Sequence, residues 1–271
     1  MPKSPGPEPS RIAHLESRAV VTLSGPDWRG FLQGLITQDV ETLAPGELRF
    51  GALLTPQGRL LFDLFILGRA DGCALDCAAD RRAALIQRLS IYRLRAKVEI
   101  VAEETAVWAA WVEAPAHDGW LADPRAAALG WRGYDIAATA TASDADYDAH
   151  RLAFGAPGPS DWGEDRSFPI EANFDLLGGI DFRKGCFVGQ ETTSRMKRRG
   201  AIKSRMAPLA FEGPPPAPGT EVLAGTLRAG EVRSGVAGRA IALVRLDRID
   251  GASLTVDGRP CRVVRPDWLV G

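Results

Sequence analysis

One stretch of this chain limits its fold more than any other. Phe211–Gly219 reads FEGPPPAPG, and three consecutive prolines cannot continue a helix or a central strand, because each lacks a backbone N–H. After this linker, residues 221–270 alternate short β-like runs with glycines, which is typical of a small β-barrel or sandwich. We therefore predict a C-terminal β-barrel over residues 207–271.

The part of the chain before the linker predicts an antiparallel sheet with a helix packed on it, and so an α+β fold. With 271 residues, two domains are expected and three compact ones are possible. The turn sequence TPQG at Thr55–Gly58 predicts a hairpin. The expected elements are a strand at 19–24, a helix at 27–39, strands at 49–54, 60–67 and 73–78, a helix capped by Asp80 and running to about Leu94, strands at 97–102 and 107–112, and a helix at 144–154.

Composition narrows the class of protein. The first 15 residues are polar and proline-rich, so we expect a disordered lead-in without a signal peptide. No run of about 18 apolar residues predicts a membrane span, and a net charge of −1 offers no bulk attraction to nucleic acid or membrane. Four cysteines without a second metal-ligand pair predict neither a metal site nor a disulfide framework. We expect reduced thiols and a cytoplasmic location.

The segment KGCFVGQE, residues 184–191, holds the most reactive-looking cysteine. Lys184 precedes Cys186 by two positions, and Gly189 opens a predicted helix that runs to Arg199. A nearby cation and helix N-terminal N–H groups both stabilise a thiolate, so we expect Cys186 to be the functional thiol. A buried small hydrophobe is the alternative for any free cysteine. One cysteine cannot hold an iron–sulfur cluster alone, but it could supply one ligand at a shared interface.

Polar residues elsewhere are also candidates. Glu171 and Asn173 lie amid apolar residues. They are either polar residues near a helix N-terminus or hydrogen-bond acceptors for the amino-pyrimidine edge of a pterin. Arg59 and Asp63 are spaced so that both project from one face of a strand. That face is either the solvent-exposed side of a sheet or the lining of a cleft. The basic run Arg195–Arg199 is either a solvated face or a holder for a polyanion such as a glutamylated folate tail or RNA phosphate. No aromatic residues are interleaved with it, which weakens a nucleic-acid role.

Several of these segments together resemble one family. KGCFVGQE resembles the K-G-C-[FY]-x-G-Q-E signature of the YgfZ-type folate-binding proteins. These are relatives of the glycine-cleavage T-protein, an aminomethyltransferase, and of mitochondrial factors that help to make [4Fe–4S] proteins. The flanking segments that also resemble this family are FLQGLITQDV (31–40), TPQGRLLFDLFI (55–66), PIEANFD (169–175) and RMKRRGAIKSR (195–205).

The resemblance implies a three-lobed T-protein-like fold around a central folate cleft. Residues 16–48 and 147–206 would form the folate-binding lobe, 49–146 the sheet-and-helix lobe, and 207–271 the barrel. The implied cofactor is tetrahydrofolate, with Cys186 and Lys184 at the reactive position. Candidate folate-binding residues are Glu171, Asn173, Arg59, Asp63, Gln190, Glu191 and Arg195.

Two departures set the chain apart from the aminomethyltransferases. Those enzymes carry G-G-x-x-D-D where this chain has Phe62 before Asp63, and R-x-E-x-G where it has Ala153. An alanine or phenylalanine cannot replace the charge and acceptors of a carboxylate, so aminomethyl transfer is not expected. We expect instead a tetrahydrofolate-binding accessory protein for the assembly or repair of [4Fe–4S] proteins. Its partners would be reduced folate and iron–sulfur assembly or client proteins. A folate-dependent one-carbon transferase and a non-catalytic folate sensor or scaffold remain alternatives.

Overall fold

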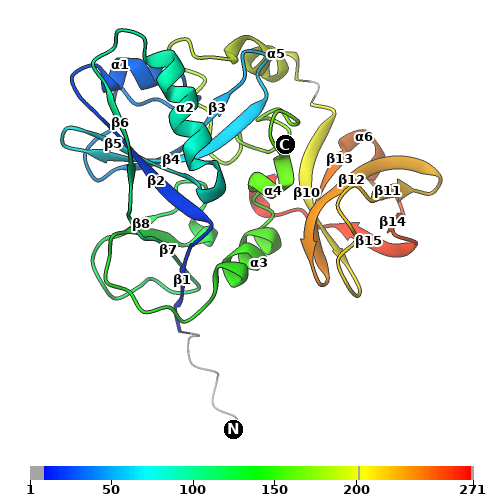
Figure 1. Cartoon of the computed structure of the whole chain (residues 1–271). Coiled ribbons are helices and arrows are strands. Elements are labelled where there is room, and N and C mark those ends of the chain that lie inside the picture. The colour runs from blue at the N-terminus through cyan, green and yellow to red at the C-terminus, as the bar shows by residue number, and fades with distance from the viewer. Residues whose placement is uncertain (1–8, 201, 270–271) are drawn as a thin grey trace. The chain divides into compact units, whose positions relative to one another are not determined.

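The computed structural model describes residues 9–200 and 202–269, and the chain forms two compact units that interleave along the sequence (Figure 1). The first unit contains the chain up to Leu32, together with Val40–Phe50 and Leu64–Asp148. The second contains Gln33–Asp39, Gly51–Asp63 and the chain from Ala149 onwards. The sequence also predicts an interleaved chain, and the extents of its three lobes stay a prediction.

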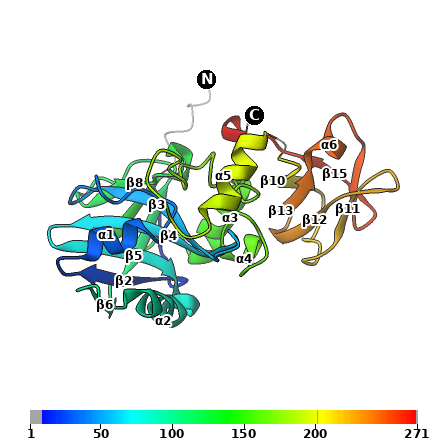
Figure 2. The same ribbon diagram turned by 90° about the horizontal axis from the view of Figure 1, so that it is seen from above.

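A five-stranded sheet dominates the first unit, with the strand order β3-β4-β5-β2-β6. Strand β4 is almost continuously apolar and is buried along nearly its whole length, as expected for a strand covered on both faces. Helix α2 contacts β2 and β6, as Figures 1 and 2 show, which confirms the predicted sheet with a helix packed on it. The bounds are β2 Arg18–Ser24, β3 Leu48–Leu54, β4 Leu60–Arg69, β5 Gly72–Ala78, β6 Glu99–Glu103 and α2 Arg82–Arg93.

A second, four-stranded sheet completes the first unit, in the order β1-β7-β9-β8. Alternate residues of β7, such as Val107 and Ala109, face a core that includes Leu15, Val20 and Tyr147. Strand β1 falls within the predicted disordered lead-in, so that prediction is wrong for Arg11–His14, while residues 1–8 lie outside the described part. The bounds are β1 Arg11–His14, β7 Val107–Trp111, β8 Trp120–Ala122, β9 Trp131–Tyr134 and the 3-10 turn η2 Ala127–Leu129.

Two predicted helix boundaries are wrong. Helix α1 covers Trp28–Gln33 and not 27–39. The chain turns at residues 34–35, and the carbonyl oxygens of Ile36 and Gln38 accept hydrogen bonds from Lys184 instead of from a following helical turn. Helix α2 is not capped by Asp80, which lies in the 3-10 turn η1, Ala79–Arg81. The N-cap of α2 is Arg81, and its side chain makes no capping hydrogen bond.

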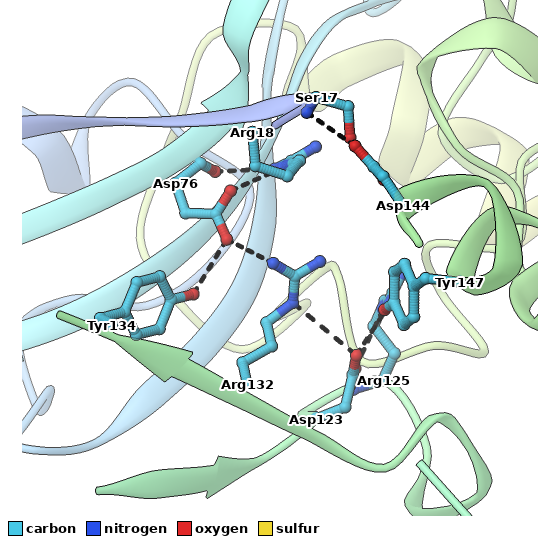
Figure 3. Close-up of polar contacts among 9 residues, drawn as sticks. All are labelled: Ser17, Arg18, Asp76, Asp123, Arg125, Arg132, Tyr134, Asp144 and Tyr147. Atoms are coloured by element: carbon cyan, nitrogen blue, oxygen red, sulfur yellow. Dashed lines mark hydrogen bonds and ion pairs between the residues drawn. The ribbon is translucent and has the colours of Figure 1, made fainter. Parts of the chain in front are cut away.

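A buried network of charged residues joins the two sheets of the first unit (Figure 3). Asp76 on β5 accepts hydrogen bonds from Arg18 Nε at 2.6 Å, from Arg132 Nη1 at 2.5 Å and from Tyr134 Oη at 3.0 Å. Burial raises the pKa of Tyr134, so its hydroxyl stays protonated and can donate. One carboxylate thus holds an arginine from each sheet.

The network continues through a second carboxylate. Asp123 accepts two hydrogen bonds from the guanidinium group of Arg125, at 3.0 and 2.8 Å, and its Oδ2 lies 3.9 Å from Arg132 Nε. Burial opposes the charge of Asp123, but Arg125 and Arg132 outweigh it and hold the pKa of Asp123 below its ordinary value. The guanidinium carbon of Arg132 also lies 3.5 Å from the centre of the Phe65 ring, a close cation–π contact.

The C-terminal part of the second unit is a closed barrel of six strands, in the order β10-β13-β12-β11-β14-β15. This confirms the predicted small barrel. Its first strand, β10, precedes the proline stretch, so Phe211–Gly219 connects two strands of the barrel. The bounds of the barrel strands are β10 Ser204–Phe211, β11 Glu221–Ala224, β12 Leu227–Val236, β13 Arg239–Arg245, β14 Leu254–Val256 and β15 Arg259–Val263. Outside the barrel strands, the bounds are α3 Asp144–Phe154, α4 Pro159–Trp162, α6 Leu246–Ile249 and the 3-10 turn η3 Asp267–Leu269.

Candidate functional site

Helix α5, Gln190–Arg199, begins where the sequence predicts and carries the second half of the motif. Its N-cap is Gly189, whose φ of 81° is a left-handed conformation that favours glycine. A Cβ atom at Gly189 would lie 2.6 Å from the carbonyl oxygen of Thr55 and 2.9 Å from the Cα of Gly58. The predicted hairpin at Thr55–Gly58 therefore packs directly on the start of α5, and this contact requires a glycine there.

Lys184 holds the motif loop against the last residue of α1 and the segment that follows it. Its ammonium group donates hydrogen bonds to the carbonyl oxygens of Gln33 at 2.7 Å, Ile36 at 2.7 Å and Gln38 at 2.9 Å. Three such bonds match the three N–H donors of a lysine. These contacts favour a positioning role for Lys184, and its expected effect on the Cys186 thiolate stays a prediction.

Cys186 differs from the other cysteines in its exposure. Its side chain is exposed, whereas Cys73 and Cys77 are buried and Cys261 is half-buried. Burial raises the pKa of Cys73 to about 12 and that of Cys261 to about 11, although nearby arginines partly offset this at Cys73. Both thiols are therefore protonated at neutral pH, as the sequence predicts. Cys186 is the cysteine that a reagent or a partner can reach most freely.

A pocket of about 570 Å³ lies along α5, within the range of small-molecule sites. Lys197 Nζ lies 5.3 Å from the centre of the Phe182 ring and 3.6 Å from Asp175 Oδ2. Two cations, an exposed aromatic ring and an amide suit a flat ligand that carries carboxylates, although the lining also contains one carboxylate, that of Glu191. The lining residues are Phe182, Gln190, Glu191, Ser194, Lys197 and Arg198.

The pocket contains only part of the predicted set. Gln190 and Glu191 line it, but Arg195 does not. Ser194 also lines the pocket and was not among the residues predicted from the sequence, although its position on the helix indicates it. Gln190, Ser194 and Lys197 follow the i, i+4, i+7 spacing of one helix face.

Glu171 and Asn173 have structural partners. Glu171 Oε2 accepts a hydrogen bond from the backbone N–H of Phe168 at 2.9 Å. Asn173 is fully buried, and its Nδ2 donates to the carbonyl oxygen of Met206 at 2.7 Å while its Oδ1 accepts from Arg205 at 3.1 Å. Both amide ends of Asn173 are used to hold the chain against β10. Their folate-binding roles stay predictions that these contacts do not favour.

Arg59 and Asp63 differ in their surroundings. Arg59 donates to the carbonyl oxygen of Arg166 at 2.6 Å, and its guanidinium carbon lies 4.8 Å from the centre of the Phe168 ring. Asp63 is only 5% exposed, so the alternative that it lies on a wet sheet face is wrong. Within the described residues, no group of three or more His, Cys, Asp or Glu side chains is arranged to hold a metal ion. Nor does any described helix combine the length and apolar character needed to cross a bilayer.

Known proteins resemble both the sequence and the fold. Residues 203–270 match the family described as CAF17, C-terminal beta-barrel domain. The chain is 30% identical over 293 residues to the mitochondrial iron-sulfur cluster assembly factor IBA57 of Homo sapiens, covering 92% of this chain and 82% of that protein. It is 34% identical over 239 residues to the mitochondrial IBA57 homologue of Mycosarcoma maydis, covering 76% of this chain. This alignment spans only 59% of the fungal protein.

The fold also has a neighbour among solved structures. The crystal structure of the glycine cleavage system aminomethyltransferase T from Bartonella henselae matches with a TM-score of 0.76. The match covers 96% of this chain and 86% of that one, at 17% sequence identity, and therefore supports a common fold. The T-protein-like α+β fold expected from the sequence is thus confirmed. The named IBA57 relatives are mitochondrial, so the cytoplasmic location stays a prediction.

Proposed function

Because this chain belongs to the family of the iron–sulfur cluster assembly factor IBA57, we propose that it acts in the assembly or repair of [4Fe–4S] proteins. The observation that carries the proposal is the exposed Cys186 thiol on a loop fixed from both sides. Lys184 ties the loop to three backbone carbonyls, and Gly189 ties it to the Thr55 hairpin. A thiol held on a rigid support can present one sulfur ligand in a defined direction.

The chemistry of such a thiol suits a cluster as cargo. Thiolates are the ligands that iron–sulfur clusters use, and a cluster normally needs four of them. Cys186 would therefore supply one ligand while a partner protein supplies the others. In this proposal the chain helps to hold a cluster at an interface and does not keep it as a resident cofactor.

Complementation tests this function. In a strain that lacks the native protein, Cys186→Ser should fail to restore [4Fe–4S] enzyme activity, while Cys261→Ser should restore it. Each variant changes one sulfur atom, so thermal unfolding should stay close to that of the wild type. Iodoacetamide labelling near neutral pH, read by mass spectrometry, should modify Cys186 first, because Cys73 and Cys261 are protonated there. Full complementation by Cys186→Ser would refute the thiol's role.

Reduced folate is the second part of the proposal. The pocket along α5 offers Lys197 and Arg198 to the carboxylates of a folate and Phe182 to an aromatic ring. Loss of one charge-assisted contact weakens binding by about tenfold or more. Arg198→Ala should therefore weaken tetrahydrofolate binding in calorimetry. Arg195→Ala is the matched control on the same helix, since Arg195 does not line the pocket. No heat or thermal shift with tetrahydrofolate or its 5-formyl form would refute folate binding.

A folate-dependent transferase is the alternative that an assay can separate. Phe62 is buried in β4, and Ala153 lies on α3, at the positions where the aminomethyltransferases carry acids. We expect only background ammonia release with the glycine-cleavage carrier protein and tetrahydrofolate. Release well above background would favour the transferase and show that other acids serve this chain.

A further inference from the structure

Helix α2 and the loop after it form the most one-sided charged segment of the first unit. Residues 81–98 contain six cationic side chains and no acidic one, in a chain whose net charge is −1. Arg82 pairs with Glu104 at 2.9 Å, and Arg81 also has a partner. In the described part of the chain, the remaining four form no ion pair or side-chain hydrogen bond; they are Arg88, Arg93, Arg95 and Lys97.

Two large apolar side chains stand among these cations. Ile91 is 61% exposed and Leu94 is 88% exposed. Ile91 lies in the last turn of α2, and Leu94 is the residue at which the helix ends. The other face of the helix, with Leu85 and Leu89, is buried where α2 contacts β2 and β6 (Figure 2). The exposed pair therefore adds nothing to the core of the first unit.

The backbone at Leu94 is also unusual. This residue is the C-cap of α2, with φ 44° and ψ −106°. Glycine is the usual residue where a helix ends at positive φ, because a Cβ atom is strained there. Here the position holds a leucine that is almost fully exposed to solvent. Neither the strain nor the exposure stabilises the isolated chain, which points to a contact made with another molecule.

We propose that the end of α2 is a docking surface for an acidic segment of a partner protein. Ile91 and Leu94 would enter an apolar pocket, and the four unpaired cations would face carboxylates around it. Ile91 on the last turn of α2 and Leu94 at its C-cap offer two neighbouring apolar anchors, as does a helix that docks into a groove. Complementary charges around them steer the encounter and fix its orientation.

Other occupants fit the same surface less well. A nucleic acid would gain nothing from two aliphatic side chains, since bases stack on aromatic rings. A lipid surface needs a broad apolar face for stable binding, whereas this helix buries its apolar face in its own unit. The proposal concerns the first unit and does not depend on the role of Cys186.

Site-specific cross-linking in cells tests the proposal. A photoreactive benzoylphenylalanine replaces Ser90, which is exposed beside Ile91, in the full-length protein. The matched control carries the same group at Leu227, an exposed position of the barrel. We expect Ser90 to yield one dominant protein, cross-linked through a peptide that carries acidic residues, and Leu227 not to yield that peptide.

Charge reversal makes the test decisive. Arg93→Glu together with Arg95→Glu should lower the cross-link yield about tenfold or more. Lysines in place of the acids of the contact peptide should then restore it. Thermal unfolding should not change, because neither arginine side chain forms an ion pair or hydrogen bond within the described residues. The proposal is overturned if the yield resists charge reversal, if no discrete protein is cross-linked, or if the arginines instead control cosedimentation with vesicles of phosphatidylcholine and phosphatidylserine.

Discussion

Asp76→Asn tests whether the buried charge network holds the first unit together. The Asp76 side chain is 1% exposed and accepts hydrogen bonds from Arg18, Arg132 and Tyr134. Asparagine keeps the shape of the side chain but removes its charge. It also turns one acceptor oxygen into an NH₂ group that faces donors.

The expected loss follows from the charges that remain. The wild-type network contains three arginines and two aspartates, so one positive charge is in excess; the variant leaves two. Removing one partner of a buried ion pair costs about 3–5 kcal/mol, because the other charge stays buried without compensation. A domain is stable by only about 5–15 kcal/mol, so the variant should lose a large share of its stability. The melting temperature should fall by roughly 10 °C.

Urea unfolding followed by tryptophan fluorescence measures this loss, since the first unit carries five tryptophans: Trp28, Trp108, Trp111, Trp120 and Trp131. Glu104→Gln is the matched control. Glu104 also pairs with an arginine, at 2.9 Å, but is 86% exposed. An exposed pair contributes about 0–1 kcal/mol, so the control should unfold close to the wild type.

A double mutant separates the charge from other effects. Arg132→Met removes one of the two cations that lose the Asp76 carboxylate in Asp76→Asn, so the double variant should lose about 2 kcal/mol less than the sum of the single variants. The buried charges do not hold the first unit together if Asp76→Asn costs less than about 1 kcal/mol, or if the two changes are additive.

Three further changes have expected outcomes. Lys184→Met leaves three carbonyl groups without their donor, and should cost about 1–3 kcal/mol and speed amide exchange in the motif loop, whereas unchanged exchange would contradict the positioning role. Gly189→Ala forces a Cβ atom to 2.6 Å from the Thr55 carbonyl oxygen, so we expect a lower melting temperature and a disturbed start of α5 by circular dichroism. A hydrogen bond from Arg69 lowers the pKa of Glu103 from 4.5 to about 2, so its contribution is present above pH 4.5 and is lost as the pH falls toward 2. In Arg69→Met the urea midpoint should therefore change less between pH 4.5 and pH 2 than in the wild type. An unchanged pH profile would contradict this role of Arg69.

The sequence predicted the elements that depend on residues close together in the chain. The strands around the Thr55 hairpin, helix α3 and the start of α5 follow from apolar periodicity and turn residues. The proline stretch Phe211–Gly219 indicated a break, but periodicity could not show that β10 before it belongs to the same barrel. That assignment depends on β10 pairing with β13 and β15, which are distant in sequence.

The candidate site depends even more on contacts that spacing does not reveal. Lys184 lies two residues from Cys186, yet its ammonium group binds a carbonyl 151 residues earlier in the chain. Asn173 has the polarity of a ligand-binding residue, but its partner is a strand of the barrel. In both cases the side-chain type was informative, while its partner was set by tertiary structure.

The interleaved chain also has a consequence for its synthesis. Gln33–Asp39 and Gly51–Asp63 leave the ribosome early, but the rest of their unit begins only at Ala149. At about 5–20 residues per second, these two segments wait for several seconds before their neighbours exist. Strands β3 and β4 each contribute residues to both units. The first unit can therefore fold while the residues that these strands contribute to the second unit have no packing partners yet. The nascent chain therefore exposes apolar strand ends during translation, and we expect it to be a substrate for the chaperones that bind at the ribosomal exit.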